Sequence, residues 1–136
     1  MELEELEASI AVLIEKALAD KQCSDFIQFP IPEKTVRLVK KKIFIDLTDY
    51  ICVIHSDEIR HVKKEHGDDV YLVSKIPSYL TKFIQVDKSF SKKHITGKSE
   101  NALVFHKRNN DNKVKIVKIN VSIKKVLKLK TFFVDV

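Results

Sequence analysis

The sequence predicts an α+β protein in which N-terminal helices pack on a four-stranded antiparallel β-sheet. Two observations carry this prediction. Apolar residues recur at three- and four-residue steps in the first part of the chain and at two-residue steps after about residue 87. The connections between the later segments are short, and short connections join antiparallel strands. Helices followed by a run of strands are typical of the α+β class.

The first part of the chain is predicted to hold two helices and a short strand. Residues 3–22 have an apolar stripe and an acidic first turn, which suits the N-terminal end of a helix dipole. Pro32 can occupy the first position of a second helix over residues 33–42. We interpret both helices as an N-terminal extension, residues 1–42. Residues 50–54 are rich in β-branched side chains and predict a buried strand.

After Gly67 the chain is expected to turn and to begin another short helix at Ile76-Pro77-Ser78. The inner side of this helix should carry Tyr79, Leu80, Phe83, Ile84 and Val86. The asparagine-rich run at 109–112 is a hairpin signal between two strands. The four predicted strands cover residues 88–96, 102–108, 113–121 and 126–135.

Charge is distributed unevenly along the chain. Residues 1–70 hold 10 Lys and Arg against 15 Asp and Glu, a net charge of −5, and residues 71–136 hold 15 against 4, a net charge of +11. The two sum to the +6 of the whole chain. A basic half of this size is typical of polyanion binders and predicts RNA as a partner. Ordinary solvated lysines on strand edges are the alternative.

Composition restricts the class of protein further. No apolar run reaches the length of a membrane span, and the acidic N-terminus is unlike a secretory signal. The two cysteines, Cys23 and Cys52, form no Cys-x-x-Cys pair, which fits a reducing compartment and argues against structural zinc. We therefore expect a cytoplasmic site of action, no membrane, no metal and no cofactor.

The segment Ile59-Arg60-His61-Val62-Lys63-Lys64-Glu65-His66-Gly67 is the most informative part of the chain. It lies in a short predicted helix that begins at an N-cap, either Ser56 or Asp57, and ends at Gly67. At 100° per residue, His66 shares a face with Ile59 and Val62, whereas His61 points away from it. Two histidines five residues apart diverge, unlike zinc ligands at i and i+4. Histidine exchanges protons near neutral pH, although packed or surface histidines are common.

With the Ile76-Pro77 helix, the strand meander and the closing Leu129-Lys130-Thr131-Phe132-Phe133, this segment resembles the phage-associated branch of the barnase–EndoU–colicin–RelE-like ribonucleases. The resemblance covers about residues 43–136, which it implies are a nuclease domain. It implies helices packed on an antiparallel sheet and RNA cleavage without metal by a toxin. A cognate antitoxin or immunity protein is a further implied partner. His61 and His66 match the helix motif of the family and Thr131 matches its last-strand position, whereas its arginine has only Arg60 and Arg108 as candidates.

Metal-free RNA cleavage needs a base for the 2′-OH proton, an acid for the departing 5′-oxygen, and cations or donors for the phosphate. We therefore assign His61 as the first proton-transfer residue and His66 as a second acid/base group or an orienting residue. Thr131 is assigned as a phosphate donor. The predicted phosphate-binding cations are Lys64, Lys107 and Arg108, and no role is assigned to His55, His94 or His106.

Two alternatives remain open at this point. A non-catalytic RNA-binding module would use the basic strands and only pack the histidines, although aromatic residues for base stacking are few. An antitoxin- or immunity-type interaction protein would bind its partner through the helix at 3–22, although the net charge of +11 in the second half argues against it.

Overall fold

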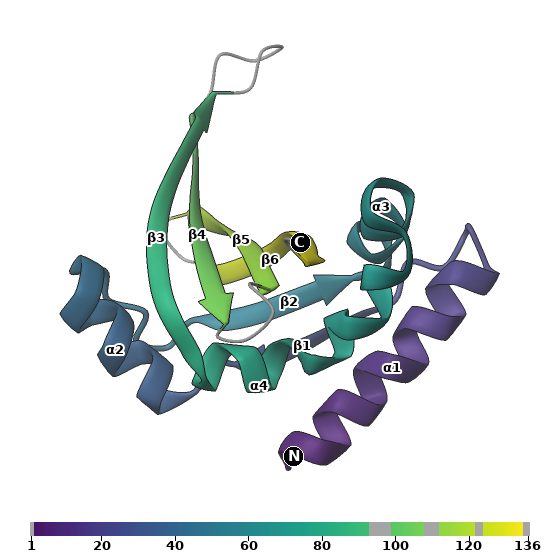
Figure 1. Cartoon of the computed structure of the whole chain (residues 1–136), viewed down its shortest axis with the longest axis horizontal. Coiled ribbons are helices and arrows are strands. Elements are labelled where there is room, and N and C mark those ends of the chain that lie inside the picture. The colour runs from purple at the N-terminus through teal and green to yellow at the C-terminus, as the bar shows by residue number, and fades with distance from the viewer. Residues whose placement is uncertain (1, 93–98, 108–111, 122–123, 135–136) are drawn as a thin grey trace.

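The computed structural model describes residues 2–92, 99–107, 112–121 and 124–134. It confirms the α+β class, with helices packed against a strongly curved sheet (Figure 1). The helical elements are α1 (Leu3–Ala19), α2 (Glu33–Ile43), α3 (Ser56–His66), the 3₁₀ segment η1 (Gly67–Lys75) and α4 (Ile76–Thr81). The strands are β1 (Phe26–Pro30), β2 (Ile51–His55), β3 (Phe83–Lys92), β4 (Ser99–Lys107), β5 (Asn112–Val121) and β6 (Lys124–Val134).

The prediction of a single four-stranded antiparallel sheet is wrong. Within the described residues the sheet has six strands in the order β1-β2-β6-β5-β4-β3. The last four strands form the expected antiparallel meander. The antiparallel pair β1–β2 joins it through a parallel pairing of β2 with β6, in which Val53 lies beside Lys128. A parallel pair needs a long crossover, and here the crossover contains α3, η1, α4 and the strands β3, β4 and β5.

Three local predictions also need correction. Strand β3 begins at Phe83, so Phe83, Ile84 and Val86 belong to the sheet and not to the preceding helix, and Ile84 is 46% exposed. The stretch after Gly67 is a continuous 3₁₀ segment rather than a simple turn. Residues 1–42 are not purely helical, because they contain β1. Helix α1 also buries Ile10 in the same apolar cluster as the sheet.

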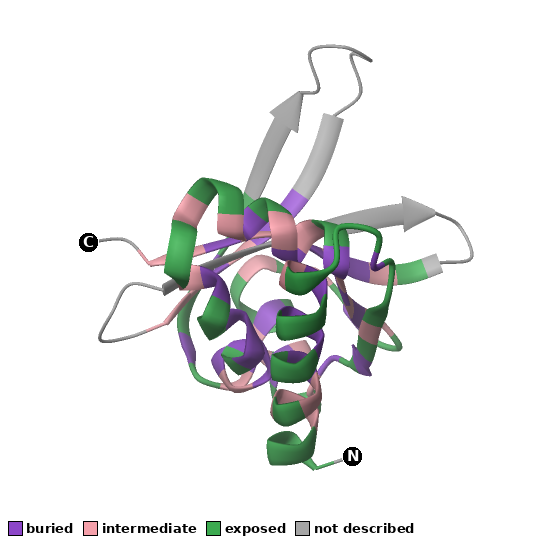
Figure 2. Ribbon diagram, turned by 90° about the vertical axis from the view of Figure 1, so that its right-hand side faces the viewer, coloured by how far each residue is buried: buried purple, intermediate pink, exposed green. Residues whose placement is uncertain are grey.

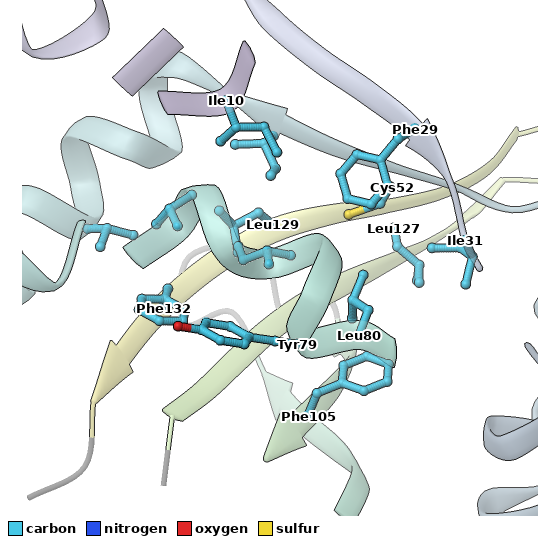
Figure 3. Close-up of a cluster of buried hydrophobic side chains, with 14 of the residues drawn as sticks. Ile10, Phe29, Ile31, Cys52, Tyr79, Leu80, Phe105, Leu127, Leu129 and Phe132 are labelled. Carbon is cyan, nitrogen blue, oxygen red and sulfur yellow. The ribbon is translucent and has the colours of Figure 1, made fainter. Parts of the chain in front are cut away.

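One face of the sheet and the inner sides of the helices enclose the core. Figure 2 shows buried residues on the sides of the helices that point toward the sheet and exposed residues on their outer sides. Figure 3 shows Tyr79 of α4 beside Phe132 of β6, and their rings stack at 5.9 Å. The core side chains of the sheet include Phe29, Cys52, Ile54, Val86, Leu103, Phe105, Leu127, Leu129 and Phe132. No helix in the described part of the chain is long and apolar enough to cross a membrane.

A buried hydroxyl joins α2 to α4. Thr35 is fully buried, and its hydroxyl donates a hydrogen bond to the carbonyl oxygen of Leu80. Leu80 lies in the last turn of α4, where carbonyls have no partner within the helix. The Thr35 side chain therefore satisfies an acceptor that water cannot reach.

We predict that Thr35→Val lowers the free energy of unfolding by about 1–3 kcal/mol, because the isosteric side chain leaves this buried carbonyl without a donor. Urea denaturation measures the change. Thr48→Val is the matched control, since the Thr48 hydroxyl bonds the exposed Asp46 carboxylate and its loss should stay within about 0.5 kcal/mol. Equal effects of the two substitutions would contradict the assignment.

Candidate active site

Helix α3 presents its two histidines as the helical wheel predicts. His61 is exposed, on the side of α3 opposite the buried Ile59 and Val62. His66 is half-buried, and its ring stacks on Phe133 of β6 with centroids 5.0 Å apart. Lys64 is exposed beside His61 on the outer side of the helix. Among the described residues neither His61 nor Lys64 makes a hydrogen bond, an ion pair or a ring contact, so nothing orients them toward the sheet.

The side chain of Arg60 is engaged in hydrogen bonds and an ion pair within the protein. Its guanidinium donates to the carbonyl oxygens of Ala17 (3.2 Å), Asp20 (3.1 Å) and Cys23 (2.8 Å). It also pairs with the Asp57 carboxylate at 2.5 Å. These carbonyls belong to the last turn of α1 and to the loop that follows it, where the backbone lacks helical partners. The Arg60 side chain is therefore committed to holding α1 on α3 and is not available to a phosphate.

The N-cap of α3 is His55, not Ser56 or Asp57. The His55 Nδ1 atom accepts a hydrogen bond from the backbone N–H of Asp57 at 3.0 Å. The Ser56 hydroxyl is buried and donates to the Cys23 carbonyl at 2.8 Å. The acceptor Nδ1 carries no proton, so the neutral ring has its hydrogen on Nε2. Sequence reasoning missed this cap because histidine is not among the preferred N-cap residues.

A shift of register in β6 decides which way Thr131 faces. Ile116 of β5 pairs with Leu129, but the neighbouring position 115 pairs with Thr131, so Lys130 is an extra residue in β6. Leu129 and Phe132 are both buried on the helix-covered face as a result. Thr131 and Phe133 therefore stand on the opposite face. The sequence alone left this parity undetermined.

The predicted cation Lys107 lies on the other side of the sheet from Thr131. Its Nζ atom is 4.6 Å from the centroid of the Tyr79 ring, which in turn stacks on Phe132. This cation–π contact anchors Lys107 at the helix-covered face. The structure therefore does not bring Lys107 and Thr131 together. Arg108 and His94 lie outside the described residues.

A histidine that the sequence left without a role has a carboxylate partner. His106 of β4 has its Nε2 atom 3.2 Å from Oδ2 of Asp87 on β3. Gln85 donates to the same oxygen from its Nε2 atom at 2.7 Å. The His106 side chain is 20% exposed and that of Asp87 is 51% exposed. The carboxylate fixes the orientation of the imidazole, and Gln85 fixes the carboxylate.

These residues share the face of the sheet that the core leaves uncovered. Thr131 of β6, position 115 of β5, Val104 of β4 and Asp87 of β3 form one row of paired residues across the sheet. In the next row, Phe133 pairs with position 113 and through it with His106. We call this surface the open face; its half-buried and exposed members include Phe26, Gln28, Ile51, Val53, His55, Gln85, Asp87, Val104, His106, Val126, Lys128, Thr131 and Phe133.

His66 borders the open face through its contact with Phe133. The end of β6 is fixed at this point, since the backbone N–H of Val134 donates to Asp69 of η1 at 3.0 Å. His106 and Phe133 lie two strand spacings apart, about 10 Å. Among the described residues the open face thus holds the imidazoles of His55 and His106, with that of His66 at its margin and the Thr131 hydroxyl in the row next to that of His106.

Neither cysteine is placed for chemistry at this surface. Cys23 and Cys52 are both free and buried. Burial raises the pKa of the Cys52 thiol to about 12, so it stays protonated and is a poor nucleophile. Within the described residues, no three His, Cys, Asp or Glu side chains gather closely enough to hold a metal ion.

Because Arg60 holds three carbonyls, we predict that Arg60→Ala lowers the free energy of unfolding by about 1.5–3 kcal/mol or more, the usual range for charged hydrogen bonds. Arg37→Ala is the control, since Arg37 is exposed on α2 and should change stability by no more than about 0.5 kcal/mol. Thermal or urea denaturation measures both. Loss of RNA affinity in Arg60→Ala without loss of stability would instead make Arg60 a phosphate ligand.

Comparison of the chain with protein-family models, with curated proteins and with solved structures finds no match. The inference of function therefore rests on the geometry of its own residues.

Proposed function

We propose that this protein is a metal-independent endoribonuclease that cleaves RNA on the open face of its sheet. The 2′-OH attacks the adjacent phosphorus, the 5′-oxygen departs, and a 2′,3′-cyclic phosphate end remains. The observation that carries the proposal is the His106–Asp87 pair, held by Gln85, on the uncovered side of strands from the basic half of the chain. The likeness to barnase–EndoU–colicin–RelE-like enzymes supports the same chemistry.

His106 has the surroundings that proton transfer requires. Its Nε2 atom is engaged by Asp87, so Nδ1 is left for a substrate, and no hydrogen bond to it is made within the described residues. A neighbouring carboxylate stabilises the imidazolium that forms when the ring takes the 2′-OH proton. We assign this step to His106, with Asp87 as its positioning residue.

The second proton-transfer step needs an acid near the departing 5′-oxygen. His66 stacks on Phe133 at the margin of the open face, with centroids 5.0 Å apart, and Phe133 is itself about 10 Å from His106. We therefore give His66 the orienting role, and a water molecule protonates the departing 5′-oxygen. The Thr131 hydroxyl can donate to a phosphate oxygen from the adjacent row. Lys128, whose side chain is 42% exposed and 4.0 Å from Glu58, is a described cation of β6 on this face.

His61 remains the alternative base. It is exposed and can reach a ligand, but it lies on the outer side of α3 with no carboxylate to orient it within the described residues. Lys64 would accompany it there. A site built on His61 would place the RNA over α3 rather than over the sheet, so substitution of each histidine in turn distinguishes the two locations.

We predict that His106→Ala lowers the rate of RNA cleavage by about a hundredfold to ten-thousandfold, the usual loss when a general acid or base is removed. Asp87→Asn should lower the rate less, because the amide oxygen can still accept a hydrogen bond from the imidazole but carries no charge. His61→Ala should stay near wild type. Cleavage is measured with EDTA present, on RNA and on a strand with 2′-deoxy nucleotides, which should resist. If His61→Ala loses activity while His106→Ala cleaves RNA at the wild-type rate, the active site lies on α3 and not on the open face.

The non-catalytic alternative is tested by binding. RNA held by the basic strands should dissociate steeply as salt rises, since each neutralised phosphate releases counterions. We predict a linear fall of the logarithm of affinity with the logarithm of salt concentration in a filter-binding titration. A steep dependence of RNA affinity on salt without cleavage would indicate an RNA-binding module. An affinity that does not change with salt would favour the interaction-protein alternative, in which the partner is the cognate protein of an antitoxin or immunity protein.

A further inference from the structure

The exposed Phe26 ring and the half-buried His55 ring form a stacked pair at the opposite side of the open face from His106. Phe26 is 56% exposed. Its ring lies nearly parallel to that of His55, at an interplanar angle of 9° with centroids 6.3 Å apart. The two residues are directly paired across β1 and β2, so both rings stand on the same face of the sheet. An exposed flat ring is a surface on which another planar ring can stack.

The His55 ring is fixed before any ligand arrives. Its Nδ1 atom accepts the Asp57 N–H that begins α3, and its side chain is only 23% exposed. The ring therefore cannot rotate without losing the cap of the helix. A rigid surface loses little conformational freedom when a ligand binds, which favours affinity.

The register of the sheet places this ring pair level with the candidate site. Strand β2 runs parallel to β6, with Val53 beside Lys128. His55 lies two residues after Val53 and is therefore level with position 130 of β6, next to Thr131. Thr131 is level with Asp87 through the pairings of β5 and β4. The ring pair, Thr131 and Asp87 thus lie along one line across the strands, with about 14 Å between β2 and β4.

We propose that the Phe26–His55 pair is a base-stacking subsite for single-stranded RNA, a few nucleotides from the bond that is cleaved. This inference rests on the proposed ribonuclease function and specifies its substrate. The net charge of +11 in residues 71–136 complements an RNA backbone that crosses strands β4, β5 and β6. Unpaired bases stack on aromatic side chains whatever their sequence, whereas the bases of a duplex are not free to do so.

Binding of a 2′-O-methyl RNA oligonucleotide tests the subsite without cleavage, because that strand has no 2′-OH to attack. Fluorescence anisotropy should show a loss of affinity of about five- to a hundredfold in Phe26→Ala, the usual effect of removing one stacked base contact. Phe26→Leu, which keeps an apolar side chain but no flat ring, should lose most of the same affinity. Phe26→Trp should retain it.

Phe44→Ala is the matched control, since Phe44 is an 88% exposed phenylalanine after α2 and should leave affinity unchanged. Melting curves establish that each variant folds. A dinucleotide is too short to reach from the His106 site to Phe26, so Phe26→Ala should cleave it at the wild-type rate while cleaving longer RNA less efficiently through a higher KM.

The outcomes separate the subsite from the enzymatic function. Phe26-dependent binding by a protein that cleaves no RNA would overturn the ribonuclease and leave the subsite standing. Wild-type affinity in folded Phe26→Ala, or no binding of the oligonucleotide by the wild type, would overturn the subsite. Equal losses in Phe26→Ala and Phe44→Ala would also overturn it, because the effect would then not belong to the open face.

Discussion

The parallel pairing of β2 with β6 is the constraint on which the rest of the structure depends. It joins the N-terminal β1–β2 pair to the meander and makes one sheet of segments that are far apart in the chain. Because α3 follows β2 without a loop, the same pairing brings α3 alongside β6. The contact of His66 with Phe133 is a consequence. Each strand of the pair is buried on one face: Cys52, Ile54 and Leu127 are fully buried on the core side, whereas Val53 and Lys128 lie half-buried on the open face.

Helix α1 is held on this framework by polar contacts at its C-terminal end and by apolar contacts along its length. Arg60 donates to carbonyls that end α1, and Ser56 donates to the loop after it. The bond of Ser56 is buried, and those of Arg60 to Ala17 and Cys23 are partly buried, so these carbonyls are largely removed from water and must find donors within the protein. The helix is thereby part of the packing of the sheet and not a detachable addition.

The extra residue in β6 divides the chemistry between the two faces of the sheet. Without it, Thr131 would follow Leu129 onto the core side, and Phe132 would turn toward solvent. With it, the core retains Leu129 and Phe132, and Thr131 joins His106 and Asp87 on the open face. Bulges often change the direction of a side chain next to a functional site. The cation–π contact of Lys107 with Tyr79 lies on the opposite face and contributes to packing there.

The sequence by itself determined the class of fold, the helix at 56–66 with its two divergent histidines, the short strand before it and the last four strands. These depend on local periodicity and, at the end of the helix, on Gly67. The sequence could not determine the pairing of β2 with β6 or the strand β1, which need contacts between distant segments. It could not predict Thr131's face, since that depends on a one-residue shift between strands. His106 had no local signal at all: Asp87 lies 19 positions away, and only the tertiary structure brings the carboxylate to the ring.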